Sequence, residues 1–201
     1  MILVIIMKKV LIATTNKDKY DAVSKIFKET IFPVNEYEIQ KLDDSMHLPD
    51  EKEYGTNVER ARSKALNAFN HLKEYGFDYI VGLDDAVFIK GRLEPNIKDY
   101  LNKILFENYL NDGEEYAFDR AYCIIDKKKN LYEVNLKIPY IYHDLKKEYV
   151  IEKFTYPLSQ VSYPIGYNVP ISELNEVDEL NYYLKYVKDG LLNLNIKTLA
   201  K

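Results

Sequence analysis

This chain of 201 residues is poor in cysteine, in histidine and in positive charge, and each shortage excludes a class of protein. Cys123 is its one cysteine, so an internal disulfide framework is excluded and a reducing compartment, the cytoplasm, is expected. The three histidines are too scattered along the sequence to indicate a zinc site. Acidic residues outnumber basic residues by 32 to 28, so no general basic field is available for long nucleic acid. A local cationic pocket for one nucleotide is compatible with this balance.

A long hydrophobic run is also missing. The apolar opening segment, Met1 to Met7, has seven residues, whereas a membrane span needs about 20. Its lysines, Lys8 and Lys9, follow the apolar residues, and a signal peptide has the opposite order. We therefore interpret this segment as part of a first strand and expect no membrane association.

The rest of the sequence mixes strand-like and helix-like patterns without a repeat or a low-complexity linker. A chain of 201 residues with 47% apolar content can bury one substantial core. The predicted fold class is therefore α/β, in a single domain over residues 1–201 with a β-rich second lobe over roughly residues 110–170. Helices are expected over residues 17–29, 56–75, 97–109 and 177–187, and strands over 4–13, 36–42, 79–83, 121–125, 131–138 and 149–154.

A polar turn directly after the first apolar strand is the most informative feature of the chain. Residues 14–19 read Thr-Thr-Asn-Lys-Asp-Lys, and apolar residues at helical spacing follow over residues 22–27. The N-terminus of a helix offers open N–H groups and a partial positive charge to an anion, and Lys17 and Lys19 add full charges. The turn therefore indicates a phosphate site. An ordinary helix cap with solvated lysines is the alternative.

Two further segments carry acidic residues where an α/β protein holds ligands. Gly55-Thr56 is typical of a loop and cap that open a helix, with Glu59 in the first turn. Asp84 and Asp85 follow an apolar run, and we expect them at the carboxyl end of that strand, where open α/β sheets gather ligands. Carboxylates and substrate phosphates are the usual ligands of Mg²⁺, so this pattern predicts a magnesium site. A simple turn or cap is the alternative for the acidic pair.

Taken in order, these motifs resemble a known enzyme family. Residues 14–19 give Thr-Thr-Asn-x-x-Lys, residues 53–65 give Glu-x-Gly-Thr-x-x-Glu-x-Ala-x-x-Lys-Ala, and an Asp-Asp pair follows a strand. This order and these separations are similar to the inosine/xanthosine triphosphate pyrophosphatase family. Residues 95–97 look like the Pro-Gly-Ile/Val turn of that family, and residues 120–123 are similar to its Arg-Ala-x-Phe strand. The likeness covers residues 8–125.

The resemblance implies an elongated mixed sheet with two lobes, a nucleotide cleft between them and usually a homodimer. It implies that a non-canonical purine nucleoside triphosphate (ITP, dITP or XTP) is hydrolysed to the monophosphate and pyrophosphate with Mg²⁺. Positioned lysines and a metal would stabilise the charge that develops on the phosphoryl oxygens. The residues implied are Thr15, Asn16, Lys19 and Lys64 for the phosphates, Glu59 and Asp85 for the metal, and Asp84 and Asp85 for catalysis on the attacking water.

The carboxyl-terminal third departs from this family pattern. The Asp-Asp-Ser-Gly motif of the family becomes Asp-Asp-Ala-Val at residues 84–87, and its late Ser-His-Arg has no counterpart at residues 194–197. Its Phe-Gly-Tyr-Asp-Pro base-pocket loop is similar only in part to Gly166, Tyr167 and Asn168 with their neighbours. There the tyrosine would stack on the base and the asparagine would hydrogen-bond to its edge. Packing of this tyrosine into a core is the alternative.

Two functions stay open at this point. The retained lysines and carboxylates favour an enzyme. The missing Ser-Gly and Ser-His-Arg elements favour a catalytically weak or inactive subunit that senses ITP or dITP and signals to an effector protein in a hetero-complex.

Overall fold

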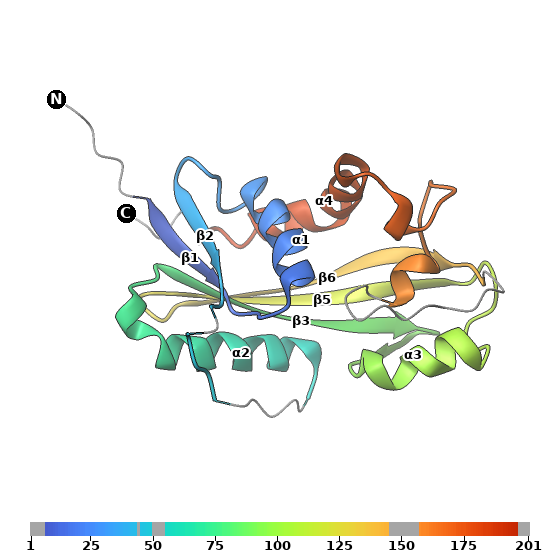
Figure 1. Cartoon of the computed structure of the whole chain (residues 1–201), viewed down its shortest axis with the longest axis horizontal. Coiled ribbons are helices and arrows are strands. Elements are labelled where there is room, and N and C mark those ends of the chain that lie inside the picture. Colours follow the sequence, from blue (N-terminus) through green and yellow to red (C-terminus); the bar gives the residue numbers. More distant parts are fainter. Residues whose placement is uncertain (1–6, 44, 50–54, 145–156, 197–201) are drawn as a thin grey trace. The chain divides into compact units, whose positions relative to one another are not determined.

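The computed structural model describes residues 7–43, 45–49, 55–144 and 157–196 (Figure 1). One mixed sheet has the strand order β2-β1-β3-β5-β6-β7, with β4 paired to β3. The strands are β1 (Lys8–Ile12), β2 (Tyr37–Lys41), β3 (Tyr79–Ile89), β4 (Arg92–Glu94), β5 (Glu115–Asp126), β6 (Leu131–Tyr142) and β7 (Ser162–Pro164). The helices are α1 (Lys17–Lys28), α2 (Asn57–His71), α3 (Ile97–Phe106) and α4 (Glu176–Leu192). Short 3-10 helices cover Lys73–Tyr75, Pro157–Gln160 and Ile171–Glu173.

The predicted α/β class is confirmed, and all four expected helices are present with ends shifted by a few residues. Three strands are longer than predicted: β3 and β5 continue through charged positions that interrupt their apolar pattern, and β6 continues beyond residue 138 to Tyr142. The expected strand over 149–154 and residues 4–6 of the expected first strand lie outside the described residues. In the part of the chain that is described, no helix has the length and apolar character needed to cross a membrane.

The chain divides into two compact units. The first comprises Met1–Asp84, Ala121–Leu136 and Val187–Lys201, and the second comprises Asp85–Arg120 and Lys137–Tyr186. The boundaries fall inside β3, β5, β6 and α4, so each of these elements contributes residues to both units.

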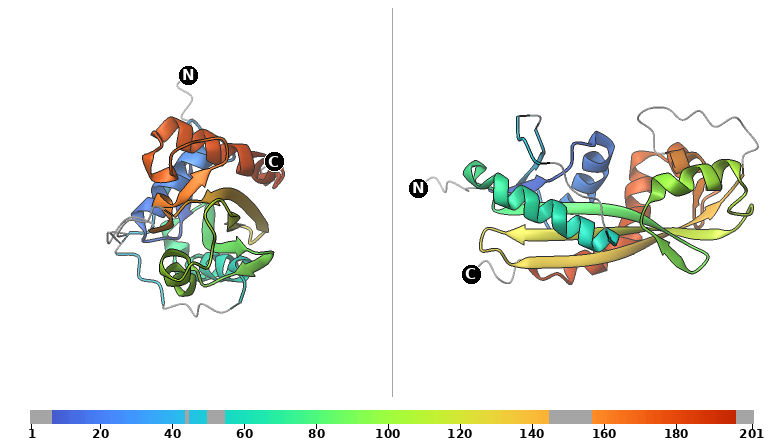
Figure 2. Two further views of the ribbon diagram at one scale, coloured as in Figure 1. Left: turned by 90° about the vertical axis from the view of Figure 1, so that its right-hand side faces the viewer. Right: turned by 90° about the horizontal axis from the view of Figure 1, so that it is seen from below.

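The first unit holds the parallel part of the sheet. Strand β1 pairs with β2 and with β3 in parallel, so that Val10 lies opposite Ile39 on one side and Tyr79 on the other. Helices α1 and α2 cover opposite faces of these strands (Figures 1 and 2). Helix α1 buries an apolar face that includes Phe27, whose ring lies 5.2 Å from that of Tyr122 on β5. The polar turn of residues 14–16 therefore links a buried strand to a packed helix.

Helix α2 approaches the sheet very closely at Gly82. A Cβ atom built on Gly82 would collide with the backbone oxygen of Ala61 and would lie 2.5 Å from the backbone nitrogen of Ala65. Three alanines of this helix, Ala61, Ala65 and Ala68, are fully buried. A glycine in a strand is typical of such a close backbone approach. The small residues thus let α2 lie directly on β3.

The second unit carries a cluster of aromatic rings. The ring of Tyr140 on β6 lies 5.3 Å from Phe118 on β5 and 5.6 Å from Tyr182 on α4. Burial raises the pKa of Tyr140 well above its ordinary value, so the hydroxyl stays protonated. The Tyr116 hydroxyl forms a hydrogen bond with Ser162 on β7. Aromatic packing therefore links β5, β6 and α4 within this unit.

Candidate functional site

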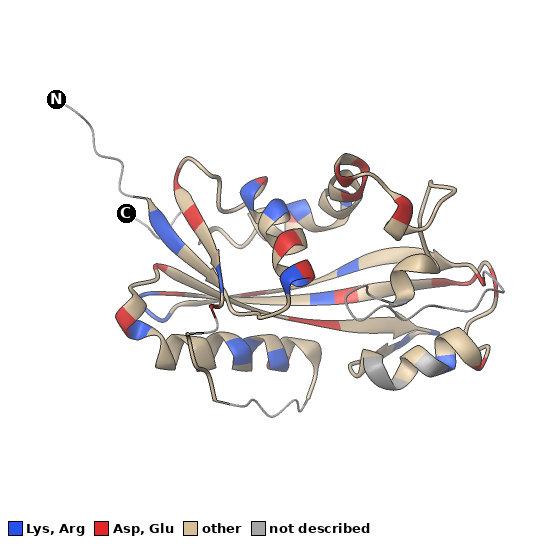
Figure 3. Cartoon of the chain, in the orientation of Figure 1, with Lys and Arg blue, Asp and Glu red and all other residues tan. Residues whose placement is uncertain are grey.

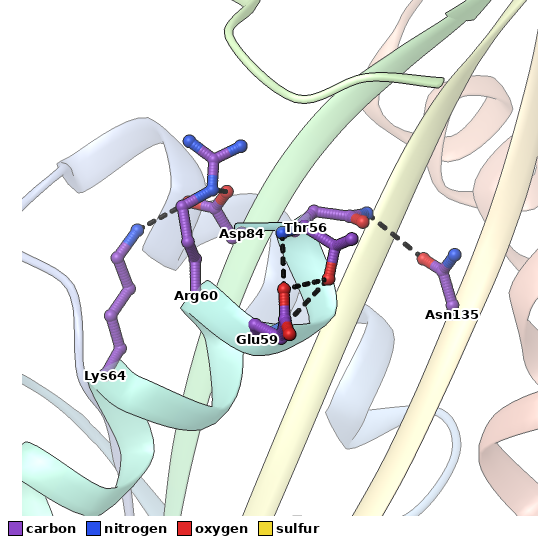
Figure 4. A network of polar contacts seen from close by, with 7 residues as sticks. Thr56, Glu59, Arg60, Lys64, Asp84 and Asn135 are labelled. Carbon is purple, nitrogen blue, oxygen red and sulfur yellow. Dashed lines mark hydrogen bonds and ion pairs between the residues drawn. The ribbon is translucent and has the colours of Figure 1, made fainter. Parts of the chain in front are cut away.

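A buried carboxylate between two cations is the centre of the candidate site in the first unit (Figure 4). Asp84 on β3 accepts a hydrogen bond from Lys64 Nζ at 2.5 Å through Oδ1, and Arg60 Nε lies 3.0 Å from its Oδ2. Both cations come from α2 and are four residues apart, so they lie on one face of the helix. Figure 3 shows basic positions along α2 and acidic positions on β3. The close approach at Gly82 brings these charges together.

The two cations of this cluster differ in exposure. The Arg60 side chain is 6% exposed and the Asp84 side chain 9%, whereas the Lys64 side chain is 22% exposed. Burying a carboxylate is energetically unfavourable unless it is paired with a cation, and removing that cation leaves an uncompensated buried charge. Arg60 is therefore the inner partner of Asp84, and Lys64 is the partner that solvent or a ligand can reach.

Thr56 and Glu59 form a reciprocal cap at the N-terminus of α2 (Figure 4). Thr56 Oγ1 accepts a hydrogen bond from the Glu59 amide at 3.3 Å, and Glu59 Oε2 accepts one from the Thr56 amide at 2.8 Å. The hydrogen bond from the Thr56 amide, aided by the Thr56 hydroxyl, lowers the pKa of the exposed Glu59 carboxyl. The predicted cap is confirmed, and one carboxylate oxygen of Glu59 is committed to it.

The polar turn after β1 caps α1 as the sequence indicated. Asn16 Oδ1 accepts a hydrogen bond from the Lys19 amide at 3.0 Å, and Thr14 Oγ1 accepts one from the Asn16 amide at 3.2 Å. Thr15 and Asn16 are exposed, and the Lys19 side chain is half-buried. These contacts show the capping role of the turn, and its phosphate-binding role stays a prediction.

Asp84 and Asp85 do not lie at the end of a strand, and that expectation is wrong. Strand β3 continues through both residues to Ile89. Successive side chains of a strand point to opposite faces. Asp84 contacts the cations of α2, whereas Asp85 Oδ1 accepts a hydrogen bond from Arg120 Nε on β5 at 2.7 Å. The two carboxylates therefore have different partners.

Asp85 belongs to the second unit and is held there by Arg120. A second, longer contact joins Arg120 Nη2 to Asp85 Oδ2 at 3.5 Å. Both side chains are nearly buried, and the Arg120 guanidinium lies 5.9 Å from the Tyr183 ring. Burial raises the pKa of Tyr183, so this ring stays neutral beside the ion pair. The sequence pointed to Arg120 only as part of a strand motif and missed this partnership.

The donor set does not fit a preformed metal site. Asp84 has a cation at each oxygen, Asp85 is bound by Arg120, and Glu59 is engaged by Thr56. Among the described residues, no group of three or more His, Cys, Asp or Glu side chains could hold a metal ion. The expected magnesium site is therefore not assembled by these side chains, and the involvement of Mg²⁺ stays a prediction.

The partly retained base-pocket loop lies in the second unit. Gly166 has φ +94°, and the Tyr167 amide donates a hydrogen bond to the Pro164 carbonyl at 3.0 Å, which is a turn that favours glycine at this position. The Tyr167 ring packs edge-to-face on Tyr182 with centroids 6.1 Å apart. Tyr167 is thus half-buried, and Asn168 is exposed.

An open hollow of about 390 Å³ adjoins this loop, and its lining residues are Asp112, His143, Asp144, Tyr163, Tyr167 and Asn168. His143 Nδ1 lies 3.0 Å from Asp112 Oδ1, and the imidazole packs edge-to-face on the Tyr163 ring. No single stretch of the sequence points to this grouping, because its members come from separate segments of the chain. The hollow offers aromatic faces and polar groups of the kind that bind a planar heterocycle.

Sequence reasoning missed Arg60, the inner partner of Asp84. Its spacing of four residues from Lys64 was visible, and i,i+4 spacing places two side chains on one helix face. The aspartate that joins them lies on a strand that begins after the helix has ended. The sequence therefore shows the spacing of the two cations on the helix but not the carboxylate that they contact.

Comparison with solved structures identifies the fold. No protein-family model matches the chain, and no curated protein matches its sequence. A nucleoside-triphosphatase, dITP/XTP pyrophosphatase, from Mycobacterium abscessus is similar with a TM-score of 0.59 at 15% identity, over 94% of this chain and 99% of that chain. A HAM1 protein from Coxiella burnetii is similar with a TM-score of 0.66 at 13% identity, over 96% of this chain and 100% of that chain. The Staphylococcus aureus Ham1 protein is similar with a TM-score of 0.56 at 11% identity, over 96% of this chain and 98% of that chain.

These likenesses span nearly the whole length of each chain, so they include the carboxyl-terminal third, where the sequence motifs fade. The mixed α/β fold that the sequence resemblance implied is confirmed, and the nucleotide cleft and the homodimer that it also implied stay predictions.

Proposed function

We propose that this chain binds a non-canonical purine nucleoside triphosphate (ITP, dITP or XTP) and hydrolyses it to the monophosphate and pyrophosphate. One observation carries the proposal: the reachable Lys64 and the buried Arg60 flank Asp84 in a chain with the fold of a dITP/XTP pyrophosphatase. Fixed cations beside a carboxylate suit an anion that is turned over by attack at phosphorus.

The phosphate-binding role is proposed for residues at the start of α1 and for a lysine in the middle of α2. Thr15, Asn16 and Lys19 lie at the N-terminus of α1, where open amides and the helix dipole favour an anion. Lys64 supplies a full charge from α2. For the purine base, we propose Gly166, Tyr167 and Asn168 of the loop that adjoins the hollow of the second unit.

Asp85 is the proposed general base. The oxygen of a water attacks the α-phosphorus, the bond to the bridging oxygen breaks, pyrophosphate leaves, and the proton of the water passes to a carboxylate. Arg120 contacts both oxygens of Asp85 and positions the carboxylate, and each oxygen has a second lone pair that can accept the proton. Asp84, which is bound by two cations, supports the site electrostatically.

Mg²⁺ would have to enter with the nucleotide. The ion is commonly held by substrate phosphates together with one or two carboxylates, and it neutralises phosphate charge there. Glu59 and Asp85 are the carboxylates proposed to contact it. A homodimer in the cytoplasm is the proposed working form, and the buried free thiol of Cys123 suits a reducing compartment.

Pyrophosphate release tests the activity. With Mg²⁺ present, the full chain should release pyrophosphate from ITP, dITP or XTP much faster than from ATP or dATP. Asp85→Asn should lower the rate by roughly 10²–10⁴-fold, the usual share of a general base. Asp189→Asn, at an exposed position of α4, is the matched control and should leave the rate unchanged. If the native chain released pyrophosphate no faster than Asp85→Asn, the proposed enzymatic function would be ruled out.

A second candidate is a nucleotide sensor that signals to an effector protein in a hetero-complex. The ion pair between Asp85 and Arg120 favours it, because both oxygens of the proposed general base already contact a cation. A ligand that binds only the folded state raises the melting temperature by mass action. If dITP raised the melting temperature without release of pyrophosphate, the sensor would be supported. An unchanged melting temperature with every purine triphosphate would rule out the nucleotide sensor.

A further inference from the structure

We propose that Arg60 takes the place of a metal cation at Asp84, so that the first unit binds a polyphosphate without any divalent ion. The inference rests on the proposed phosphate-binding role of Lys64. It concerns which charge stays with the aspartate while that lysine binds its ligand.

The first step of the argument is the occupancy of Asp84. Lys64 takes one carboxylate oxygen at 2.5 Å, and Arg60 lies 3.0 Å from the other (Figure 4). A guanidinium is charged at every pH at which proteins fold, so its charge at Asp84 is permanent. A divalent ion at this carboxylate would have to displace one of the two cations.

The second step is the mobility of Lys64. A lysine that binds a phosphate has to leave the carboxylate that it contacts, and a buried carboxylate left alone is strongly unfavourable. Asp84 is 9% exposed, so this cost would fall on ligand binding if Lys64 were its sole cation. Arg60, at 6% exposure, stays with Asp84 when the more exposed Lys64 turns to its ligand.

The third step is the anchoring of Arg60. It lies in the second turn of α2, whose first turn is fixed by the Thr56–Glu59 cap and whose backbone lies against β3 at Gly82. Both ends of the contact are thus held by regular structure. Arg60 therefore acts as a positioning residue: it frees Lys64 for a phosphate, and it has no contact of its own with the phosphate.

The test uses inorganic triphosphate as the probe and calorimetry on the full chain, with EDTA or Mg²⁺ in excess. The native chain should bind the probe in EDTA. Arg60→Gln should weaken that binding by about tenfold or more, where each tenfold is about 1.4 kcal/mol. Added Mg²⁺ should restore binding to this variant, because one oxygen of Asp84 is then open to a metal.

Two further variants separate this role from general effects of charge. Arg60→Gln combined with Asp84→Asn should bind in EDTA nearly as well as the native chain, because no carboxylate is left to strand. Arg62→Gln is the matched control: it removes the same charge from the same helix, at a residue paired with Glu133, and should keep native affinity. Arg60→Lys, which retains the charge, serves if Arg60→Gln fails to fold.

Native binding that is lost in EDTA and restored by Mg²⁺ would overturn the inference, and so would native affinity of Arg60→Gln in EDTA. In those cases, pyrophosphate release from dITP would leave the proposed function standing. Failure of the native chain to bind triphosphate in either buffer would overturn the inference, and if no pyrophosphate were released from dITP either, the proposed function would be overturned as well.

Discussion

Glu59 shows how one side chain can meet a structural need where the sequence suggested a metal ligand. Its carboxylate accepts hydrogen bonds from the amide and the hydroxyl of Thr56 and completes the cap of α2. The sequence contained both signals, because Thr-x-x-Glu before a helix is also a capping box. The geometry confirms the cap and leaves the metal role as a proposal.

This cap makes stability depend on pH in a defined direction. The pKa of Glu59 is lowered in the folded chain by the hydrogen bond from the Thr56 amide. Its contribution is therefore fully present above the pKa of the unfolded chain and is lost as the pH falls through the lowered folded value. Glu59→Gln should destabilise the chain near neutral pH and less so in acid, as measured by urea midpoints across the pH range.

A constant difference between native and Glu59→Gln midpoints at all pH values would contradict the charged cap. Glu74→Gln, which removes the same charge just after α2, is the control and should show no such pH-dependent difference.

Asp84 and Asp85 mark the limit of sequence reasoning at single residues. Their chemical types were sufficient to select them as site candidates. Their partners, Arg60, Lys64 and Arg120, come from a preceding helix and a later strand, and this pairing depends on the packing of α2 and on the position of β5 beside β3. Local periodicity does not encode such distant neighbours.

At the scale of elements, the contact between α2 and β3 positions the first unit's charges. Gly82 has no side chain to hold the helix away, and Ala61 and Ala65 present the helix backbone to it. The i,i+4 spacing of these two alanines was visible in the sequence. Their partner was not, because a single glycine inside an apolar strand does not say which helix approaches it.

Gly82→Ala tests this contact. The added methyl group would meet the backbone of Ala61 and Ala65, which cannot move aside as a flexible side chain could. We expect a loss of about 1–3 kcal/mol in the free energy of unfolding, the usual cost of overpacking, measured by urea denaturation. Ser63→Ala, on the exposed side of the same helix, is the control and should change little. Native stability of Gly82→Ala would contradict the close approach.

Element ends were predicted less well than element types. Helices began and ended near the expected residues because caps such as Asn16 and Thr56 are local signals. Strand β3 was cut short at Leu83 because two aspartates follow it, and charge was interpreted as the end of burial. Ion pairs with Arg60 and Arg120 allow the two aspartates to be buried within the strand, and these partners were not visible in the sequence pattern.

At the scale of the whole molecule, the two units share their strands. Strands β3, β5 and β6 each begin in one unit and end in the other. Because each of these strands is continuous, loss of strand structure in one unit also disrupts the strands of the other unit. We therefore expect the chain to unfold in one cooperative step.

Two probes can test this cooperativity. Cys123 lies in the first unit, is 1% exposed, and has a pKa that burial raises to about 12, so Ellman's reagent should react with it only after unfolding. Tyrosine absorbance reports on the buried rings of both units, including Tyr116, Tyr140 and Tyr182 in the aromatic cluster of the second unit. The two signals should change at the same urea concentration. Separate midpoints would show that the units unfold independently.

The peptide bond that joins Asp84 to Asp85 is also the first point at which the chain passes from the first unit to the second. Because neighbouring strand positions face opposite ways, a substitution at one aspartate leaves the contacts of the other in place. Under the proposed function, ligand capture and bond cleavage can thus diverge separately within this dipeptide, and a substitution at Asp85 would be a short mutational route from turnover to recognition alone, with no change of fold.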